Sequence, residues 1–311
     1  MHKLYVLVGP TAVGKSRVAL ELAGRLNAEI VSADSRQVYR HMDIGTAKPS
    51  AEDRARIPHH LIDVADPDEE FTLVHFRARA LKVIAEIIAR GKTPLVVGGT
   101  GLYVRSLTEG FSVPPVPPDS AVRAHLEARA ETEGSANLYR ELAEIDPAAV
   151  EHIHPSNTRR IVRALEVWHA TGRPFSYWQR RTPVPYDVVR LGLTCEREEL
   201  YRRIDGRVDQ MMADGLVDEV QDLVARGYDW ALPSMSSLGY RQLGEYLRGE
   251  CTLPDAVQRI KFATHRYARQ QYAWFRPGDP AIAWFQASGS PRDVADGILE
   301  TITEGVASSL N

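Results

Sequence analysis

Apolar residues form short continuous runs in the first hundred positions, and these runs alternate with amphipathic stretches. The segments "KLYVLVG", "AEIVSAD" and "TPLVVGG" are apolar and bounded by glycine or aspartate, as buried strands typically are. Between them, residues 15–26 and 72–90 carry apolar positions at helical spacing. Strands that alternate with helices predict βαβ units, and therefore a parallel sheet flanked by helices.

The pattern changes after residue 112. The stretch "SVPPVPPDS" at 112–120 predicts a rigid connector, and from there to about residue 180 the periodicity is purely helical. Residues 119–134 and 155–172 each begin at a capping residue and end at glycine. A strand returns at 186–194. We therefore predict an α/β core made of residues 1–112 and 187–311, interrupted by an all-helical insertion at 113–186.

Composition narrows the class of protein. The chain has 311 residues, of which 44% are hydrophobic and 25% charged, as in soluble globular proteins. No apolar run approaches the roughly 20 residues that cross a bilayer, and the first run is too short for a secretory signal. These features predict a cytoplasmic protein, and the lack of a long coiled-coil pattern predicts a monomer.

The cysteines and the adjacent histidines form no metal-binding motif in the sequence. The two cysteines, Cys195 and Cys251, form no Cys-x-x-Cys pair, which argues against a disulfide framework or a cysteine zinc site. His59 and His60 are adjacent, so their side chains diverge, and no further ligand cluster stands near them. We predict a structural role for both histidines and no zinc.

Arginines are distributed unevenly although the net charge is only −3. Residues 153–190 hold seven arginines against two acids, and residues 257–276 hold four arginines and one lysine with no acid. Such segments indicate either a polyanion contacted at particular places or solvated helix faces, and charge alone leaves both interpretations open.

Helical periodicity places the arginines on faces. Arg159, Arg160 and Arg163 lie near one face of their helix, opposite Ile161, Leu165 and Trp168, so a basic face and a core-facing stripe coexist. In the later basic segment an arc of about 100° holds Arg259, Arg266, Arg269 and Arg276. We predict that the aromatic residues of that segment, Tyr267, Trp274 and Phe275, belong to the core.

The stretch "GPTAVGKS" at residues 9–16 matches the phosphate loop G-x-x-x-x-G-K-[ST], between a predicted strand and a predicted helix. Its glycines let successive amides point inward, Lys15 reaches across the phosphates, and Ser16 is positioned to ligate Mg²⁺. The loop specifies a pyrophosphate group and leaves the rest of the ligand open. The predicted diphosphate-binding residues are Gly9, Pro10, Thr11, Ala12, Val13, Gly14, Lys15 and Ser16.

Asp34 ends the second predicted strand, at the edge where open α/β sheets bind ligands. In a kinase a carboxylate at this place would position the acceptor or the metal. A kinase also needs a nucleoside-recognition element or an Arg-rich lid, and the sequence contains no motif that we identify as either.

Six motifs occur in an order that resembles the tRNA dimethylallyltransferases, from Leu4 to about Arg276. They are "GPTAVGKS", "DSRQVY", "MDIGTAKP", "PLVVGGTGLYVRSL", "NTRRIVRALEV" and "SLGYRQ". The resemblance implies a P-loop NTPase-like core whose ligand is dimethylallyl diphosphate. It also implies transfer of the dimethylallyl group to the exocyclic amine of the adenine immediately 3′ of the anticodon in tRNA, with release of diphosphate.

The resemblance also implies roles for individual residues. Asp34 is the general base, Thr11 contacts the diphosphate, and Arg207 binds the same group, with Arg203 one turn earlier as an alternative. The segment "RQQYAWFR" departs from the family, where a Lys-Arg-Gln run is common, and this leaves the RNA contacts there open. The implied tRNA-binding residues are Asp34, Ser35, Arg36, Gln37, Thr100, Arg123, Arg159, Arg160, Arg163, Tyr240, Arg241, Arg269 and Arg276.

Three other functions use the same phosphate loop: a small-molecule kinase, an adenylate isopentenyltransferase acting on a free nucleotide, and a nucleotide-switched RNA-binding protein. A helical insertion with an arginine face argues against a free nucleotide as acceptor, because such an acceptor leaves that face without a use.

Overall fold

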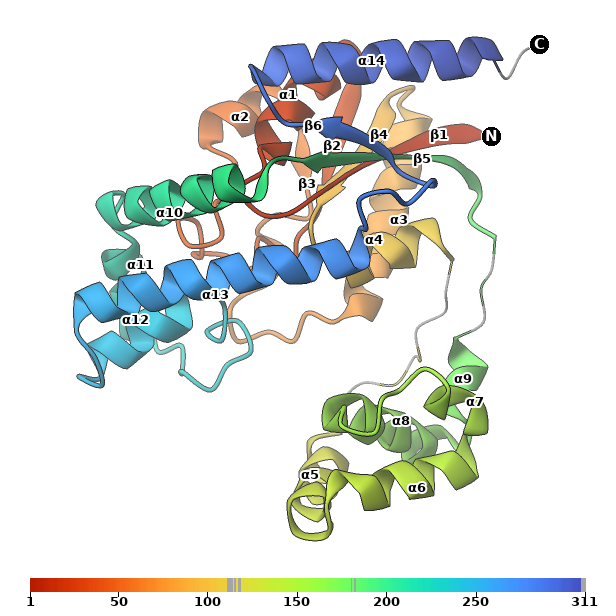
Figure 1. The fold of residues 1–311 in the computed structure, drawn as a ribbon, viewed down its shortest axis with the longest axis vertical. Coiled ribbons are helices and arrows are strands. Elements are labelled where there is room, and N and C mark those ends of the chain that lie inside the picture. The colour runs from red at the N-terminus through yellow and green to blue at the C-terminus, as the bar shows by residue number, and fades with distance from the viewer. Residues whose placement is uncertain (111–113, 115, 117–118, 180, 182, 309–311) are drawn as a thin grey trace. The chain divides into compact units, whose positions relative to one another are not determined.

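We describe residues 1–110, 114, 116, 119–179, 181 and 183–308 in a computed structural model of the chain (Figure 1). The chain forms two compact units, one of residues 1–107 with 185–311 and the other of residues 108–184. The boundary predicted at 112/113, and most of the proline-rich connector, lie outside the described residues. Within the described part of the chain, no helix combines the length and apolar character needed to cross a membrane.

The larger unit is built on a six-stranded sheet in the order β3-β2-β4-β1-β5-β6, and all neighbouring strands are parallel. The parallel sheet predicted from the alternating pattern is thus confirmed. The two strands absent from the prediction, β3 and β6, are short and lie at the edges. The strands are β1 (His2–Val8), β2 (Ala28–Ala33), β3 (His59–His60), β4 (Thr93–Gly98), β5 (Tyr186–Thr194) and β6 (Ala283–Gln286).

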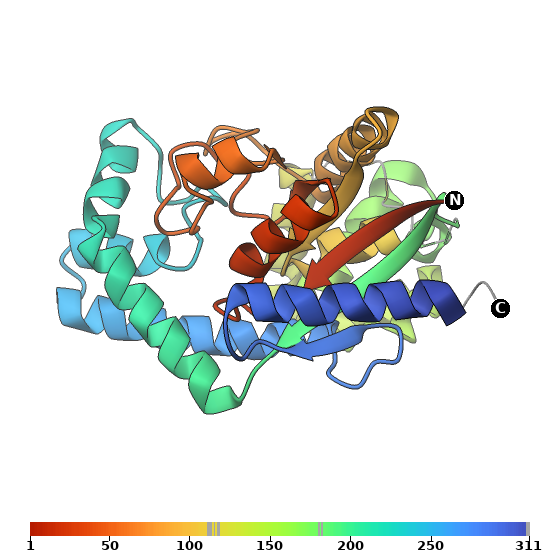
Figure 2. The same ribbon diagram turned by 90° about the horizontal axis from the view of Figure 1, so that it is seen from above.

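Helices cover both faces of the sheet because the central strands are apolar on both sides. In β1, Tyr5 and Leu7 face a cluster shared with α1 (Lys15–Arg25), α10 (Arg197–Ala213) and α14 (Pro291–Ser308). Leu4, Val6 and Val8 face the opposite cluster, shared with α3 (Leu73–Ala89) and α4 (Gly101–Thr108). Figure 2 shows α1 and α14 side by side.

A third cluster of buried residues joins the segment after β2 to the helices that follow β5. Val38 and Met42 pack with residues of α10, α11 (Leu216–Ala225), α12 (Tyr240–Leu247) and α13 (Leu253–Trp274). The short α2 (Ala51–Arg56) follows the same segment and begins with a capping box on Ser50. This cluster builds a wall beyond the carboxyl ends of the strands, where parallel sheets bind ligands.

In the described residues of the smaller unit every regular element is a helix, as the periodicity predicted, and there are five of them, two of which fall in the segments 119–134 and 155–172. The core of this unit holds Leu126, Leu138, Leu142, Ile161 and Leu165. The helices are α5 (Ser120–Glu133), α6 (Ser135–Ile145), α7 (Pro147–Val150), α8 (Thr158–Thr171) and α9 (Phe175–Trp178). Two of the other helices, α7 and α9, have only four residues, too few for a periodic signal, and α6 follows directly after the glycine that ends α5.

Candidate active site

The phosphate loop connects β1 to α1 and depends on glycine at both ends. Gly9 has a φ of +146°, and a Cβ built on it would lie 2.5 Å from the carbonyl oxygen of Leu193. Gly14 caps α1 with a φ of +107°, and Ala12 between them also has a positive φ. These conformations curl the backbone tightly, which is the geometry of an anion-binding loop at a helix N-terminus.

Lys15 folds back onto this loop. Its Nζ donates hydrogen bonds to the carbonyl oxygens of Gly9 and Pro10, at 2.9 and 2.7 Å. Burial lowers the pKa of Lys15 to about 7, the positive charge of Arg207 acts in the same direction, and Asp34 opposes both. An anion placed against Lys15 would favour its charged form, so this lysine is suited to holding a diphosphate.

Ser16 is exposed and lies in the first turn of α1. Within the described residues its hydroxyl has no hydrogen-bond partner in the protein. The hydroxyl is therefore available to a ligand or a metal-bound water.

Asp34 directly follows β2, at the carboxyl edge of the sheet. Its Oδ1 accepts hydrogen bonds from the backbone N–H of Arg36 at 2.8 Å and of Gln37 at 3.4 Å, which closes the turn after the strand. Its Oδ2 makes no hydrogen bond within the described part of the chain. One carboxylate oxygen thus fixes the turn and the other is left for a reacting group.

Three hydroxyl groups lie beside Asp34. The backbone N–H of Ser35 donates to Thr100 Oγ1 at 3.1 Å, and Thr100 Oγ1 lies 3.4 Å from Ser35 Oγ. Tyr267 of α13 is hydrogen-bonded to Thr100 as well, and burial followed by the charge of Asp34 raises its pKa. The turn after β2, the turn after β4 and α13 are therefore linked at this point.

Two of the three aromatic residues predicted to be core differ from that prediction. Tyr267 lines the cavity at the site, and Trp274 is 37% exposed beside the guanidinium of Arg105; only Phe275 is buried. Helical spacing separates an apolar face from a polar one, but it does not distinguish a packed core from the wall of a cavity.

Arg203 and Arg207, one turn apart on α10, have different surroundings. Arg203 donates to Glu199, to the carbonyl oxygen of Val13 at 3.2 Å and to that of Ala287 at 3.0 Å. Arg207 has no hydrogen-bond or ion-pair partner among the described residues. Burial lowers the pKa of Arg207, whereas the charge of Asp34 raises it. Arg207 is thus free to bind an anion, and Arg203 braces the phosphate loop.

These groups surround one cavity of about 1330 Å³ in the larger unit. Its lining includes the phosphate loop, Asp34 and the turn after β4. The segment 43–47, from the motif "MDIGTAKP", forms a further part of the lining. A cavity of this size has room for a diphosphate ester together with a nucleobase.

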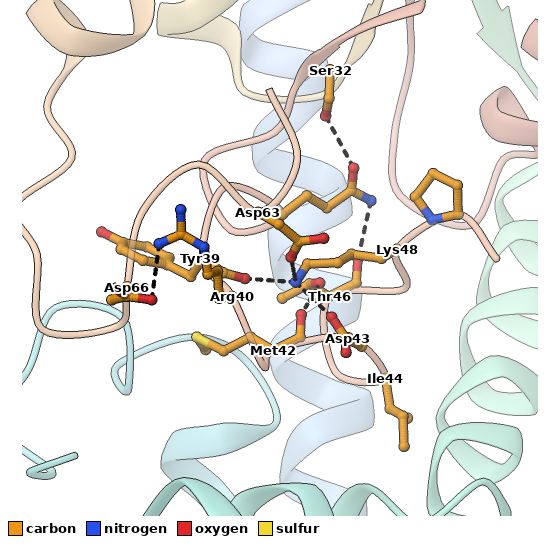
Figure 3. Close-up of polar contacts among 12 residues, drawn as sticks. Ser32, Tyr39, Arg40, Met42, Asp43, Ile44, Thr46, Lys48, Asp63 and Asp66 are labelled. Atoms are coloured by element: carbon orange, nitrogen blue, oxygen red, sulfur yellow. Dashed lines mark hydrogen bonds and ion pairs between the residues drawn. The ribbon is translucent and has the colours of Figure 1, made fainter. Parts of the chain in front are cut away.

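The buried ammonium group of Lys48 fixes the segment 43–47 through its hydrogen bonds (Figure 3). The buried Nζ of Lys48 contacts the carbonyl oxygen of Tyr39 at 2.6 Å, Asp43 at 2.6 Å and Asp63 at 2.5 Å. Gln37 adds hydrogen bonds from its amide to the carbonyl oxygens at 46 and 47, both 3.2 Å long, and accepts one from Ser32. Gln37, implied above to bind tRNA, thus also shapes the cavity lining.

We expect Lys48→Met to lower the free energy of unfolding by about 2 kcal/mol, because it leaves the Tyr39 carbonyl and two carboxylates without their shared donor. Urea denaturation measures this change. Lys82→Met is the matched control: Lys82 is 79% exposed and only 4.0 Å from Glu86, so its effect should stay below about 0.5 kcal/mol. Equal effects of the two substitutions would contradict the role given to Lys48.

Glu219 of α11 binds the backbone of the same segment. Its carboxylate accepts hydrogen bonds from the backbone N–H groups of Asp43, Ile44 and Gly45, and from the hydroxyl of Tyr240 at 2.6 Å. The ring of Tyr240 is fully buried, and Gly45 lies so close that a Cβ there would sit 2.5 Å from it. Because its side chain belongs to the core, we leave Tyr240 out of the tRNA contacts proposed below.

The other implied RNA-binding residues of the larger unit have varied surroundings. Arg241 and Arg276 are exposed, with no side-chain partner among the described residues. Arg269 donates to the hydroxyl of Tyr201 at 2.7 Å, and Arg36 donates to the carbonyl oxygen of Pro233 at 2.8 Å. Each of these guanidiniums keeps further donors.

In the helical unit, two of the predicted RNA-binding arginines form ion pairs within the protein and two do not. Arg163 and Arg123 both bind the buried carboxylate of Glu166, at 2.7 and 2.9 Å. Arg159 and Arg160 are exposed, and no side-chain partner is found for them in the described residues. Sequence periodicity predicted one face but not the buried acid that holds two of its members.

His59 and His60 make contacts within the protein, as predicted. His59 Nδ1 lies 2.7 Å from the carbonyl oxygen of Ile57, and His60 Nε2 lies 2.7 Å from Glu29. Across the described ranges, no group of three or more His, Cys, Asp or Glu side chains is placed to hold a metal ion.

The sheet, the phosphate loop and the carboxylate at the next strand end define an α/β protein with a phosphate-loop core. A family model described as IPP transferase matches residues 37–278, and one described as isopentenyl transferase matches residues 2–60. The chain belongs to the IPP transferase family, a family of prenyltransferases.

Similar proteins agree with this assignment. The tRNA dimethylallyltransferase of Roseiflexus sp. (strain RS-1) is 53% identical over 276 residues, which is 89% of this chain and 90% of that one. The enzyme of the same name from Geobacter metallireducens is 50% identical over 303 residues, 96% of each chain.

Two solved structures have the same fold. The tRNA isopentenylpyrophosphate transferase of Bacillus halodurans has a TM-score of 0.73 at 40% identity and covers 100% of both chains. A eukaryotic dimethylallyltransferase acting on tRNA has a TM-score of 0.79 at 28% identity, covering 92% of this chain and 74% of that one. The fold expected from the sequence is thus confirmed.

Proposed function

We propose that the protein transfers the dimethylallyl group of dimethylallyl diphosphate to the exocyclic amine of the adenine immediately 3′ of the anticodon in tRNA. The observation that carries this proposal is one cavity that is lined both by the phosphate loop and by a carboxylate with one free oxygen. The names of the similar proteins supply tRNA and the dimethylallyl group, and the resemblance of the six motifs implies the adenine beside the anticodon. The product that leaves is diphosphate.

The phosphate loop acts on the leaving group. Negative charge builds on the diphosphate as the allylic C–O bond breaks, and the loop amides, Lys15 and Arg207 are complementary to that charge. Thr11 and the rest of residues 9–16 enclose the same group. The loop therefore stabilises a departing diphosphate, whereas in a kinase it would hold the donor nucleotide.

The donor set at the loop fits Mg²⁺. This ion usually binds one or two protein oxygens and completes its shell with water and phosphate oxygens. The free hydroxyl of Ser16 supplies one such oxygen without a cluster of carboxylates. When bound, Mg²⁺ would add positive charge at the diphosphate.

On the acceptor side, Asp34 removes a proton from the adenine amine as the C–N bond forms. Ser35, Arg36, Gln37 and Thr100 surround the base, which must leave the anticodon-loop stack to reach the cavity. Arg123, Arg159, Arg160, Arg163, Arg241, Arg269 and Arg276 are proposed for the RNA backbone, and the enzyme is proposed to act as a cytoplasmic monomer.

The direct test is incubation of the purified protein with labelled dimethylallyl diphosphate and unmodified tRNA, followed by nucleoside analysis. Prenylated adenosine at the position 3′ of the anticodon is expected. Consumption of ATP with dimethylallyl diphosphate left untouched would establish a kinase instead, and prenylation of free AMP but not tRNA would establish the adenylate isopentenyltransferase.

We expect the double substitution Arg159→Ala and Arg160→Ala to weaken tRNA binding, because both guanidiniums are free to pair with phosphates. The slope of log affinity against log salt concentration should fall by about one for each phosphate that is left unpaired. Filter binding at several salt concentrations measures it. Arg140→Ala, an exposed arginine on α6, is the control, and an unchanged slope in the double variant would mean that this face is merely solvated.

A further inference from the structure

A buried glutamine of α13 joins two sides of the active-site cavity. Gln271 is only 4% exposed, and both ends of its amide are bonded. Its Oε1 accepts the backbone N–H of Thr11 in the phosphate loop at 2.7 Å, and its Nε2 donates to the carbonyl oxygen of Gly99 at 3.0 Å. One side chain thus connects the loop after β1 to the end of β4. Gln271 and Thr11 are 260 residues apart in the sequence.

The space around this amide is closely fitted. A Cβ built on Gly99 would lie 2.1 Å from Gln271 Nε2 and 3.4 Å from the carbonyl oxygen of Gly9. Glycine at position 99 therefore allows the glutamine to reach between the two strand ends. A shorter side chain at 271 would not span both partners, and an apolar one would satisfy neither.

Each partner of Gln271 belongs to a different half of the proposed reaction. Thr11 lies in the loop that holds the leaving group. Gly99 precedes Thr100, whose hydroxyl is bonded to Ser35 next to Asp34. The Gln271 amide is consequently a short connection between the side that binds diphosphate and the side that binds the acceptor base.

Resting on the proposed function, we propose that Gln271 is a positioning residue that sets the separation between the diphosphate and the attacking amine. In prenyl transfer the allylic carbon lies between the oxygen that leaves and the nitrogen that attacks, so the rate depends steeply on the distance between the two binding sites. The N–H of Thr11 is bonded to Gln271, so this N–H orients the loop and is not offered to the diphosphate.

The test compares Gln271→Met with Gln270→Met in single-turnover prenylation of tRNA. Gln270 is the same residue type one position earlier on the same helix, but it is exposed and has no side-chain partner in the described part of the chain. Gln271→Met is expected to lower the turnover number about 10- to 100-fold, with tRNA affinity close to that of the control. Because it leaves the Thr11 N–H and the Gly99 carbonyl oxygen unpaired, it should also lower the melting temperature by several degrees, so both variants are assayed well below that temperature with the folded fraction measured by circular dichroism.

Gln271→Glu gives a readout that poorer packing alone would not produce. The ionised carboxylate can accept the Thr11 N–H but repels the Gly99 carbonyl oxygen, whereas the protonated form can donate to that oxygen. The rate of Gln271→Glu relative to wild type is therefore expected to rise as the pH falls, with folding checked by circular dichroism at each pH.

A Gln271→Met turnover number equal to that of Gln270→Met, or a decrease explained entirely by unfolded protein, would overturn the positioning role. So would a pH-independent ratio of Gln271→Glu to wild type. If wild type and Gln270→Met both fail to prenylate tRNA, the proposed function is wrong and this inference falls with it, an outcome that the control separates from the others.

Discussion

Replacing Asp34 by asparagine is expected to lower the turnover number about 1000-fold while leaving tRNA affinity nearly unchanged. The exocyclic amine of adenine is a weak nucleophile that must lose a proton as its bond to carbon forms, and an amide does not accept that proton. Asparagine keeps an Oδ1 that can accept the Arg36 N–H, which is 2.8 Å away in the native turn. The substitution therefore removes the base and preserves the backbone around it.

Single-turnover prenylation and filter binding measure these two quantities separately. Asp34→Ala should lose the same catalytic step and also loosen the turn, so it should be at least as slow. Asp68→Asn changes an exposed aspartate with no hydrogen-bond partner among the described residues, and it should behave as wild type. A turnover number of Asp34→Asn near the wild-type value would mean that another group accepts the proton.

Replacing Arg207 by methionine is expected to lower kcat/KM for dimethylallyl diphosphate about 100-fold without lowering the melting temperature. Its guanidinium faces the cavity and is bonded to no described group, so its removal leaves no protein atom unsatisfied. The variant lacks positive charge at the place where the leaving diphosphate becomes more negative.

Arg203→Met is the matched variant, one helical turn away. It removes the donors to the carbonyl oxygens of Val13 and Ala287 and to Glu199, so it should lower the melting temperature by several degrees. Kinetics with varied dimethylallyl diphosphate and thermal unfolding distinguish the two arginines. A stable Arg203→Met with the larger kinetic defect would assign the diphosphate contact to Arg203.

The central strands and the long helices were predictable from the sequence because each is encoded by a local pattern. The strand β1, the glycine loop and α1 follow one another within 25 residues, and α3 was predicted within one residue at each end. The strands β3 and β6 carry only two and four residues, too few for a periodic signal. Their places at the sheet edges depend on pairing with β2 and β5.

The site residues, too, comprise some that a local pattern encodes and others that depend on contacts across the fold. The phosphate loop and Asp34 were found because a motif and a strand end are encoded by a few neighbouring positions. Gln271, Tyr267 and Glu219 were not assigned to the site because each acts on a segment distant in sequence. Glu219 and Gln271 are polar residues on the apolar sides of their helices, and this position could have marked both as buried and hydrogen-bonded. It could not have shown which groups they bind.

Local patterns in the chain were enough to specify the parallel α/β core, the phosphate loop, the carboxylate beside it and, through six ordered motifs, the family. Backbone propensity and spacing act over short stretches, so the amino-acid order alone encodes these features. The folded arrangement was needed to show which of two neighbouring arginines is free, that Tyr240 is core while Tyr267 lines the cavity, and that one glutamine spans two strand ends. Those outcomes depend on which buried donors and acceptors meet across the fold. A hydrogen bond requires two groups to be close in space, and their separation along the chain does not determine this.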